Sequence, residues 1–225
     1  MTYDLFIGDR TFSSWSLRGW LMLEKFCLPY RTHMVGLYSG KMAEEMAQIA
    51  PARLVPALRL PDGTVVGESV AMAETLAERH PDAGLWPADP AARATARWLV
   101  AEMASSFAAL RSACPMQLMD VKVNFPMTEA VAKDLARVEA LWAHAGSYAV
   151  DGPWLFGAYS LVDAFYAPVC ARIVGYDLPV SQAARTYCQT TISDPVFQAW
   201  RADGLHVSYD PVPYAMDLET VRWPA

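Results

Sequence analysis

The chain has 225 residues, of which 54% are hydrophobic and 19% are charged, and this composition supports a large apolar core and excludes a disordered chain. Its formal net charge is −6, with no run of like charges, which argues against a nucleic-acid partner or an anionic membrane surface. Charged residues interrupt the first ten positions, unlike a signal peptide, and no long apolar stretch follows. We therefore expect a cytoplasmic protein with no membrane partner.

The first elements form a strand, helix and strand. Thr2 to Gly8 is apolar and partly alternating, which predicts a strand, and a helix begins near Ser14 to Ser16 and ends before Pro29. Tyr30 to Leu37 is the second strand. Because crossovers of this type are right-handed, we expect the two strands to be parallel neighbours. Lys41 to Ile49 follows as a short, poorly regular helix.

A hairpin and a helix come next. Leu54 to Leu60 has strand character but contains Pro56, so it is either an edge strand or the proline has a local role. The residues of Pro61 to Gly63 favour a turn, and Thr64 to Val66 is the return strand. Ser69 is a good N-cap for a helix that ends at His80.

Prolines and glycines between residues 81 and 90 indicate a linker, which divides the chain into an α/β domain at 1–80 and an all-α domain at 91–225. Helical spacing predicts helices over Ala91 to Arg111 and Thr128 to Ala145. Ser160 and Asp163 form a capping box before an apolar run, a structural role that we favour over catalysis. The last part of the chain is rich in aromatic residues and prolines and is a candidate to pack over a site. Its residues of this kind are Tyr209, Pro211, Pro213, Tyr214 and Trp223.

Three features near the hairpin favour a small zwitterionic peptide as ligand. The backbone of Val55 can pair with an extended peptide, and the amides that open the helix at Ser69 favour a carboxylate. Glu68 can receive an ammonium group. The alternative is a plain hairpin packed on a helix, with Pro56 in the trans form.

Ala50-Pro51, Val55-Pro56 and Glu68-Ser69 resemble the glutathione-binding half of the thioredoxin-like domain of glutathione transferases. The resemblance implies that Pro56 is cis and that Glu68 and Ser69 bind the γ-glutamyl end of glutathione. The Gly157-x-x-Ser160-x-x-Asp163 pattern resembles the capping motif of the helical domain in the same family. The resemblance implies a homodimer that uses glutathione as co-substrate.

Hydroxyl groups precede the first helix. A serine there, beside the positive end of the helix, can hydrogen-bond a ligand thiol and favour its thiolate. The alternative is that Ser14 or Ser16 is simply an N-cap and that Ser13 is a polar group of the loop. The stretch from Ser13 to Arg18 resembles the zeta-type transferases, which include maleylacetoacetate isomerases. The resemblance places the catalytic serine at Ser13, its neighbour at Ser14, and Trp15 where those enzymes have a cysteine.

The same resemblance suggests that Lys41 neutralises the glycyl carboxylate, with a solvated lysine as the alternative. We expect the electrophile pocket between the domains, lined by Met103, Phe107, Arg111 and Trp15, although aromatic and methionine residues at that spacing are more often core. The cysteines and histidines lack metal-ligand spacing, so we expect no metal and four buried free thiols.

These patterns together predict a glutathione transferase that conjugates the glutathione thiolate to a small electrophile. A glutathione-dependent cis-trans isomerase of the maleylacetoacetate type is one alternative. A non-catalytic protein that binds glutathione or apolar ligands is another.

Overall fold

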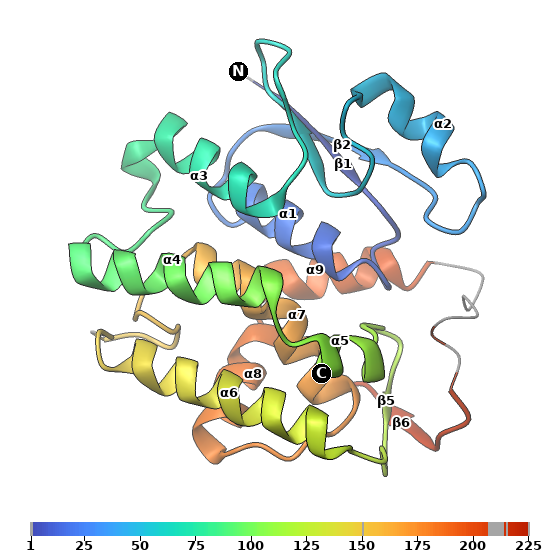
Figure 1. Cartoon of the computed structure of the whole chain (residues 1–225), viewed down its shortest axis with the longest axis vertical. Helices are drawn as coiled ribbons and strands as arrows, with labels where there is room; N and C mark the ends of the chain where they lie inside the picture. Colours follow the sequence, from blue (N-terminus) through green and yellow to red (C-terminus); the bar gives the residue numbers. More distant parts are fainter. Residues whose placement is uncertain (1, 150, 207–213, 215, 225) are drawn as a thin grey trace.

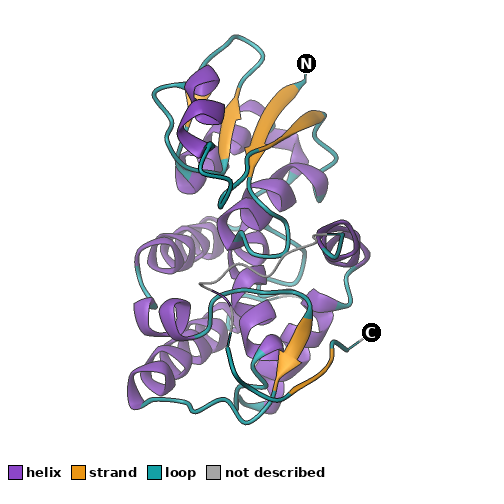
Figure 2. Ribbon diagram, turned by 90° about the vertical axis from the view of Figure 1, so that its right-hand side faces the viewer, coloured by secondary structure: helices purple, strands orange, loops and turns teal. Residues whose placement is uncertain are grey.

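The computed structural model describes residues 2–149, 151–206, 214 and 216–224. A small sheet with its helices lies above a larger helical part, and α1 lies along the boundary between them (Figure 1). In the view turned by 90°, the strands of the upper part stand apart from the helices below (Figure 2).

The sheet has four strands in the order β2-β1-β3-β4. β1 pairs with β2 in parallel, as predicted, and β3 is antiparallel to both β1 and β4. Pro56 lies just before β3, which is an inner strand, so the edge-strand interpretation is wrong and the role of the proline is local. The strands are β1 (Tyr3–Ile7), β2 (Tyr30–Met34), β3 (Ala57–Arg59) and β4 (Val65–Val66).

Helices cover both faces of this sheet because successive side chains of a strand point to opposite faces. Leu5 and Ile7 of β1 pack into the main core with α1 and α3, whereas Phe6 packs on the other face with Met46 and Ile49. The helices of this part are α1 (Ser14–Glu24), α2 (Met42–Met46), the 3₁₀ turn η1 (Ala47–Ile49) and α3 (Ser69–Arg79).

The rest of the described chain is mostly helical, which confirms the predicted fold class of an α/β part followed by a helical part. The segment predicted as a linker contains the 3₁₀ turn η2 (Pro81–Ala83), and the division at residues 80 and 90 stays a prediction. The helices are α4 (Pro90–Ser105), α5 (Ala108–Ala113), α6 (Glu129–Gly146), α7 (Leu161–Gly175), α8 (Gln182–Ile192) and α9 (Pro195–Gly204).

The single helix expected over Ala91 to Arg111 is two helices, because Phe107 has a left-handed backbone with φ of 62°. The Arg111 side chain stabilises this break, since its Nη1 donates to the carbonyl oxygens of Ala104 and Ser106, both at 3.4 Å. A basic side chain satisfies carbonyls that a helix end leaves unpaired.

The helical part is also not purely α. β5 (Asp120–Lys122) pairs with β6 (Thr220–Arg222) in an antiparallel ladder, and this joins the end of the chain to the segment before α6. Each strand has three residues, which is too short for a recognisable alternation in the sequence.

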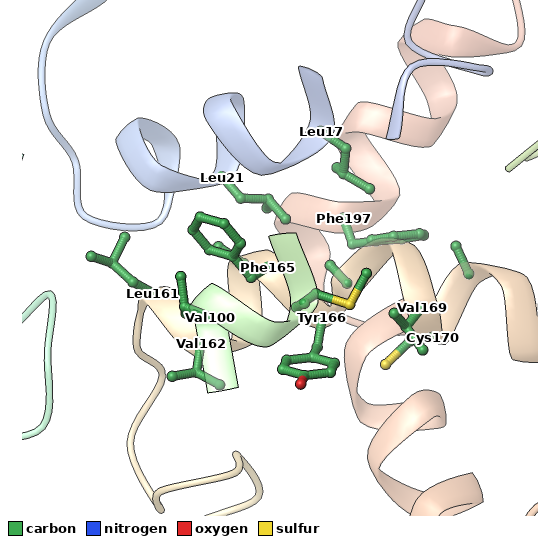
Figure 3. Packing of buried hydrophobic residues seen from close by; sticks show 14 of the residues in the cluster. Leu17, Leu21, Val100, Leu161, Val162, Phe165, Tyr166, Val169, Cys170 and Phe197 are labelled. Carbon is green, nitrogen blue, oxygen red and sulfur yellow. The ribbon is translucent and has the colours of Figure 1, made fainter. Parts of the chain in front are cut away.

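The core is centred on α7, all of whose residues are buried. Leu17 and Leu21 of α1 face Phe165 of α7, and Phe197 of α9 belongs to the same hydrophobic cluster (Figure 3). Cys114, Cys170 and Cys188 are buried as expected, but Cys27 is exposed, because it lies in the turn after α1. Across the described residues, no helix is long and apolar enough to span a bilayer.

Candidate active site between the sheet and the helical part

A cavity of about 870 Å³ lies where the first turn of α1 meets the helical part. The sheet side supplies the segments before α1, β3 and α3, and the helical side supplies α5, its flanks and α7. The lining residues are Phe12, Ser13, Ser14, Trp15, Leu37, Tyr38, Met42, Leu54, Val55, Pro56, Gly67, Glu68, Ser69, Ser105, Ser106, Ala108, Arg111, Ser112, Pro115, Met116, Arg172 and Tyr214.

Ser13 is the N-cap of α1. Its Oγ accepts a hydrogen bond from the Ser16 amide at 3.3 Å and donates to the Ser16 hydroxyl at 2.7 Å. Ser16 Oγ in turn accepts from the Gly8 amide at 2.9 Å, so the network fixes the end of β1 against α1. The N-cap of α1 is therefore Ser13 rather than Ser14 or Ser16, as the capping alternative had it, and Ser13 also lines the cavity.

The Ser14 hydroxyl has a different partner. Arg172 Nη2 donates to Ser14 Oγ at 3.4 Å, while its Nε and Nη1 donate to the carbonyl oxygens of Cys114 and Pro168 at 2.8 and 3.1 Å. Burial, followed by the charge of Arg111, lowers the pKa of Arg172 to about 10. Arg172 was not predicted, although an arginine within the apolar run that forms α7 was a visible signal.

The segment before β3 and the start of α3 form the opposite wall. The Val55-Pro56 peptide bond is cis, as the family resemblance implied, and the Ala50-Pro51 bond is also cis. Glu68 is the N-cap of α3 and Ser69 is its first residue, so Ser69 does not cap the helix as predicted. Ser69 is 3% exposed, and its Oγ has no hydrogen-bond partner within the described part of the chain.

The Trp15 ring in the cavity wall contacts two arginines. The guanidinium carbons of Arg18 and Arg111 lie 4.3 and 4.7 Å from the centre of the Trp15 ring, within the range of cation–π attraction. Arg18 is also 5.4 Å from the Phe165 ring, and burial, then the charges of Arg172 and Arg111, lowers its pKa. The indole thus holds Arg111 in the cavity wall.

Tyr214 closes one side of the cavity. It accepts a hydrogen bond from the Tyr38 hydroxyl at 2.8 Å and packs against the Phe12 ring at 4.8 Å. Of the tail residues expected over a site, Tyr214 lines the cavity and Trp223 is buried in the core. The predictions for Tyr209, Pro211 and Pro213 lie outside the described residues.

Three residues predicted for the site are not among those that line the cavity. Met103 and Phe107 are buried in the core and do not line the cavity, whereas the neighbouring Ser105 and Ser106 do. Lys41 is exposed at the start of α2 and is also not a lining residue, whereas its neighbour Met42 is. Arg111 does line the cavity, as we expected.

The charges of the cavity are separated. Glu68 is the acidic lining residue on the sheet side, and Arg111 and Arg172 are the basic ones on the helical side. Among the residues that the structure describes, no cluster of histidine, cysteine and acidic side chains could hold a metal ion. The cavity therefore suits a ligand with an ammonium group at one end and negative charge elsewhere.

Comparison with known proteins agrees with this geometry. Residues 12–79 match the family described as the N-terminal domain of glutathione S-transferase. A probable maleylacetoacetate isomerase from Caenorhabditis elegans is 31% identical over 199 residues, which cover 86% of this chain and 90% of the relative. This chain belongs to the glutathione S-transferase superfamily. Its predicted similarity to zeta-type members is confirmed by these relatives.

Other members of the superfamily extend the match. The maleylacetoacetate isomerase of Rattus norvegicus is 28% identical over 143 residues, or 63% of each chain. A glutathione transferase homologue from Burkholderia gl BGR1 with bound glutathione has a TM-score of 0.66 at 25% identity, over 91% of this chain and 98% of that one. Glutathione transferase Omega 3C from Trametes versicolor shares the fold, with a TM-score of 0.67 at 23% identity over 95% and 91% of the two chains.

Proposed function

We propose that this protein binds glutathione on the sheet side of the cavity and conjugates its thiolate to a small electrophile held on the helical side. The observation that carries the proposal is the buried hydroxyl of Ser69 at the start of α3, which has no hydrogen-bond partner among the residues that the structure describes. A buried hydroxyl without a partner costs free energy, and a ligand carboxylate would satisfy it. The amides that begin an 11-residue helix add positive potential at the same place.

Glutathione fits the residues of this wall. Its γ-glutamyl carboxylate would accept hydrogen bonds from Ser69 and the first amides of α3, and its ammonium group would pair with Glu68. Val55 lies just before β3, outside the strand ladder, so its backbone can pair with the extended tripeptide. This placement directs the cysteinyl sulfur toward the first turn of α1, where Ser13 and Ser14 lie.

The chemistry then needs a thiolate. The sulfur loses its proton to solvent, and a serine hydroxyl and the positive end of α1 stabilise the anion. A sulfur lone pair forms the bond to the electrophilic carbon, and a leaving group departs with its bonding electrons, or water protonates the carbanion after addition to a double bond. The residues orient both partners in the cavity, which lowers the entropic cost of the reaction.

Cis-trans isomerisation is a second candidate, favoured by Arg111 and Arg172 on the helical side of the cavity and by the names of the two relatives. Two guanidinium groups there suit a substrate with carboxylates. The thiolate would add to the double bond, the resulting single bond would rotate, and the sulfur would leave as the double bond forms again. Trp15 stands where zeta-type enzymes have a cysteine, so its indole changes the shape of the cavity wall. Conjugation and isomerisation can therefore be told apart by the substrate that the cavity accepts.

Calorimetric titration with glutathione tests the binding site. We expect Ser69→Ala to weaken binding about tenfold or more, since a charge-assisted hydrogen bond is worth about 1.5–3 kcal/mol, and Glu68→Gln to weaken it as well. Ser147→Ala, at the exposed end of α6, is the matched serine control and should leave the affinity unchanged. Wild-type affinity in Ser69→Ala would contradict this placement.

Turnover separates the three functions. Conjugation of an electrophile that has a leaving group supports the transferase, and conversion of a maleyl-type diacid to its trans isomer without loss of glutathione supports the isomerase. Glutathione binding with neither reaction supports the non-catalytic alternative. The homodimer, the cytoplasmic location and the contact of Lys41 with the glycyl carboxylate remain predictions, and sedimentation equilibrium tests the first of them.

A further inference from the structure

The two adjacent serines at the start of α1 are not equivalent. The Ser13 hydroxyl is engaged on both sides, since it accepts from the Ser16 amide and donates to Ser16 Oγ. The Ser14 hydroxyl accepts from Arg172 and donates to no acceptor among the described residues, so its proton is available to a group in the cavity. A hydroxyl group can donate only one hydrogen bond. The group that donates to its oxygen therefore influences the direction in which its own O–H points.

Arg172 is well placed to fix the orientation of Ser14. It is 4% exposed, and the carbonyl oxygens of Cys114 and Pro168 hold two of its nitrogens while the third reaches Ser14. The five donors of a guanidinium are rigid relative to one another, so two anchored nitrogens set the position of the third. Because these anchors lie at Cys114, after α5, and within α7, the helical part controls a hydroxyl of the sheet side.

We propose that Ser14, oriented by Arg172, donates the hydrogen bond that stabilises the glutathione thiolate, whereas Ser13 holds the first turn of α1 in place. This inference rests on the proposed function and assigns the residues that serve it. Ser14 is the catalytic residue in this scheme, because it touches the reacting sulfur. Arg172 is a positioning residue that acts through Ser14.

The charges around the site agree with this assignment. Arg172 is a buried cation that donates hydrogen bonds to carbonyl and hydroxyl oxygens among the described residues, so an anion in the cavity would complement its charge. Arg111 from α5 also lines the cavity, and Arg18 from α1 contacts the Trp15 ring. Glu68 is the acidic lining residue, and it belongs to the start of α3 on the opposite wall.

The experiment follows the ultraviolet absorbance of the thiolate of bound glutathione against pH, in wild type, Ser14→Ala, Ser13→Ala and the control Ser147→Ala. We expect Ser14→Ala to bind glutathione and to raise the pKa of the bound thiol by at least one unit, which is a tenfold loss of thiolate near neutral pH. Ser14→Thr keeps a hydroxyl and should restore the thiolate. Ser13→Ala should lower the urea midpoint, because it removes the cap of α1, and should shift the thiol pKa by less than Ser14→Ala.

A rise in the thiol pKa of Ser13→Ala as large as that of Ser14→Ala would overturn the assignment. Failure of the proposed function gives a different result, because wild type would then not bind glutathione or would bind it with an unshifted thiol. Circular dichroism and urea unfolding of every variant separate a change in the site from a loss of fold.

A double-mutant cycle tests the role of Arg172. Arg172→Lys keeps the positive charge but not the rigid set of donors, so we expect a raised thiol pKa in the wild-type background. If Arg172 acts through Ser14, the same substitution should have little further effect in Ser14→Ala, and the two changes should be non-additive. Fully additive effects would show that Arg172 acts on the thiolate directly, and would overturn the positioning role.

Discussion

The Tyr187 hydroxyl of α8 donates a hydrogen bond of 2.9 Å to Asp163 Oδ1 in the first turn of α7. The same oxygen accepts from the Leu155 amide at 3.2 Å, and Oδ2 accepts from the amide and hydroxyl of Ser160 at 2.8 and 3.3 Å. Asp163 is fully buried. One carboxylate therefore joins the loop before α7, the cap of α7 and α8, which confirms the structural role predicted from the capping box.

Removing this carboxylate should destabilise the fold strongly. In Asp163→Asn, one acceptor becomes an NH₂ group, which cannot accept from the Ser160 or Leu155 amides, and a buried donor is left unsatisfied. We expect the free energy of unfolding to fall by about 2–4 kcal/mol, measured by urea unfolding. Asp177→Asn, on an exposed residue after α7, is the matched control and should change it by about 0.5 kcal/mol or less. Equal effects of the two changes would contradict a special role for Asp163.

Asp163 also predicts a pH dependence. Burial raises its pKa from 3.8 to about 6, against the opposing effect of its hydrogen bonds. Between these values the folded chain holds a proton that the unfolded chain has lost, so the contribution of this group to stability falls as pH rises from about 4 to about 6. The change amounts to about 3 kcal/mol.

Hydrogen bonds from His33 and Arg137 lower the pKa values of Asp4 and Glu102, respectively. The contributions of these two groups to stability therefore rise with pH, whereas that of Asp163 falls. The measurement is therefore the difference between the unfolding free energies of wild type and Asp163→Asn across pH 4–7. A difference that does not vary with pH would contradict the raised pKa of Asp163.

The turn after α1 offers a stabilising change. Cys27 has a left-handed backbone with φ of 53° and is exposed, and the Leu28 amide donates to the Leu23 carbonyl at 3.0 Å across the turn. Glycine adopts this conformation without the steric cost of a Cβ atom. We expect Cys27→Gly to raise the free energy of unfolding by about 0.5–1 kcal/mol in thermal or urea unfolding. Cys27→Ala keeps the Cβ and should give no gain, so a similar gain in both variants would point to the loss of the thiol.

We expect the Trp15 side chain in the cavity wall to contribute to the stability of the fold. Trp15→Ala removes the ring that contacts both Arg18 and Arg111, and we expect a loss of about 2 kcal/mol in the free energy of unfolding. Trp98→Ala is a suitable control, because Trp98 also stacks on an arginine, Arg137 at 5.7 Å, but is 46% exposed. Its loss should be below about 1 kcal/mol. A larger loss for Trp98 than for Trp15 would contradict the proposed support of the cavity wall.

Local sequence determined much of this protein, because the interactions that it encodes lie within one turn or one strand. The capping box at Ser160 and Asp163 needs residues three positions apart, and the parallel pairing of the first two strands follows from a short crossover. The motifs around Pro56 and Ser69 were recognisable because each is a run of adjacent residues. These patterns were sufficient for the fold class and for most of the sheet side of the cavity.

The tertiary structure decided the helical side. Arg172 meets Ser14 across 158 residues, and no local pattern encodes that pairing. Met103 and Phe107 are buried in the core, and the left-handed backbone of Phe107 divides the single helix that the spacing of the sequence predicted. Tyr214 reaches the cavity through long-range contacts with Tyr38 and Phe12. Contacts of this kind depend on the packing of whole elements, and only the assembled fold determines which distant side chains meet.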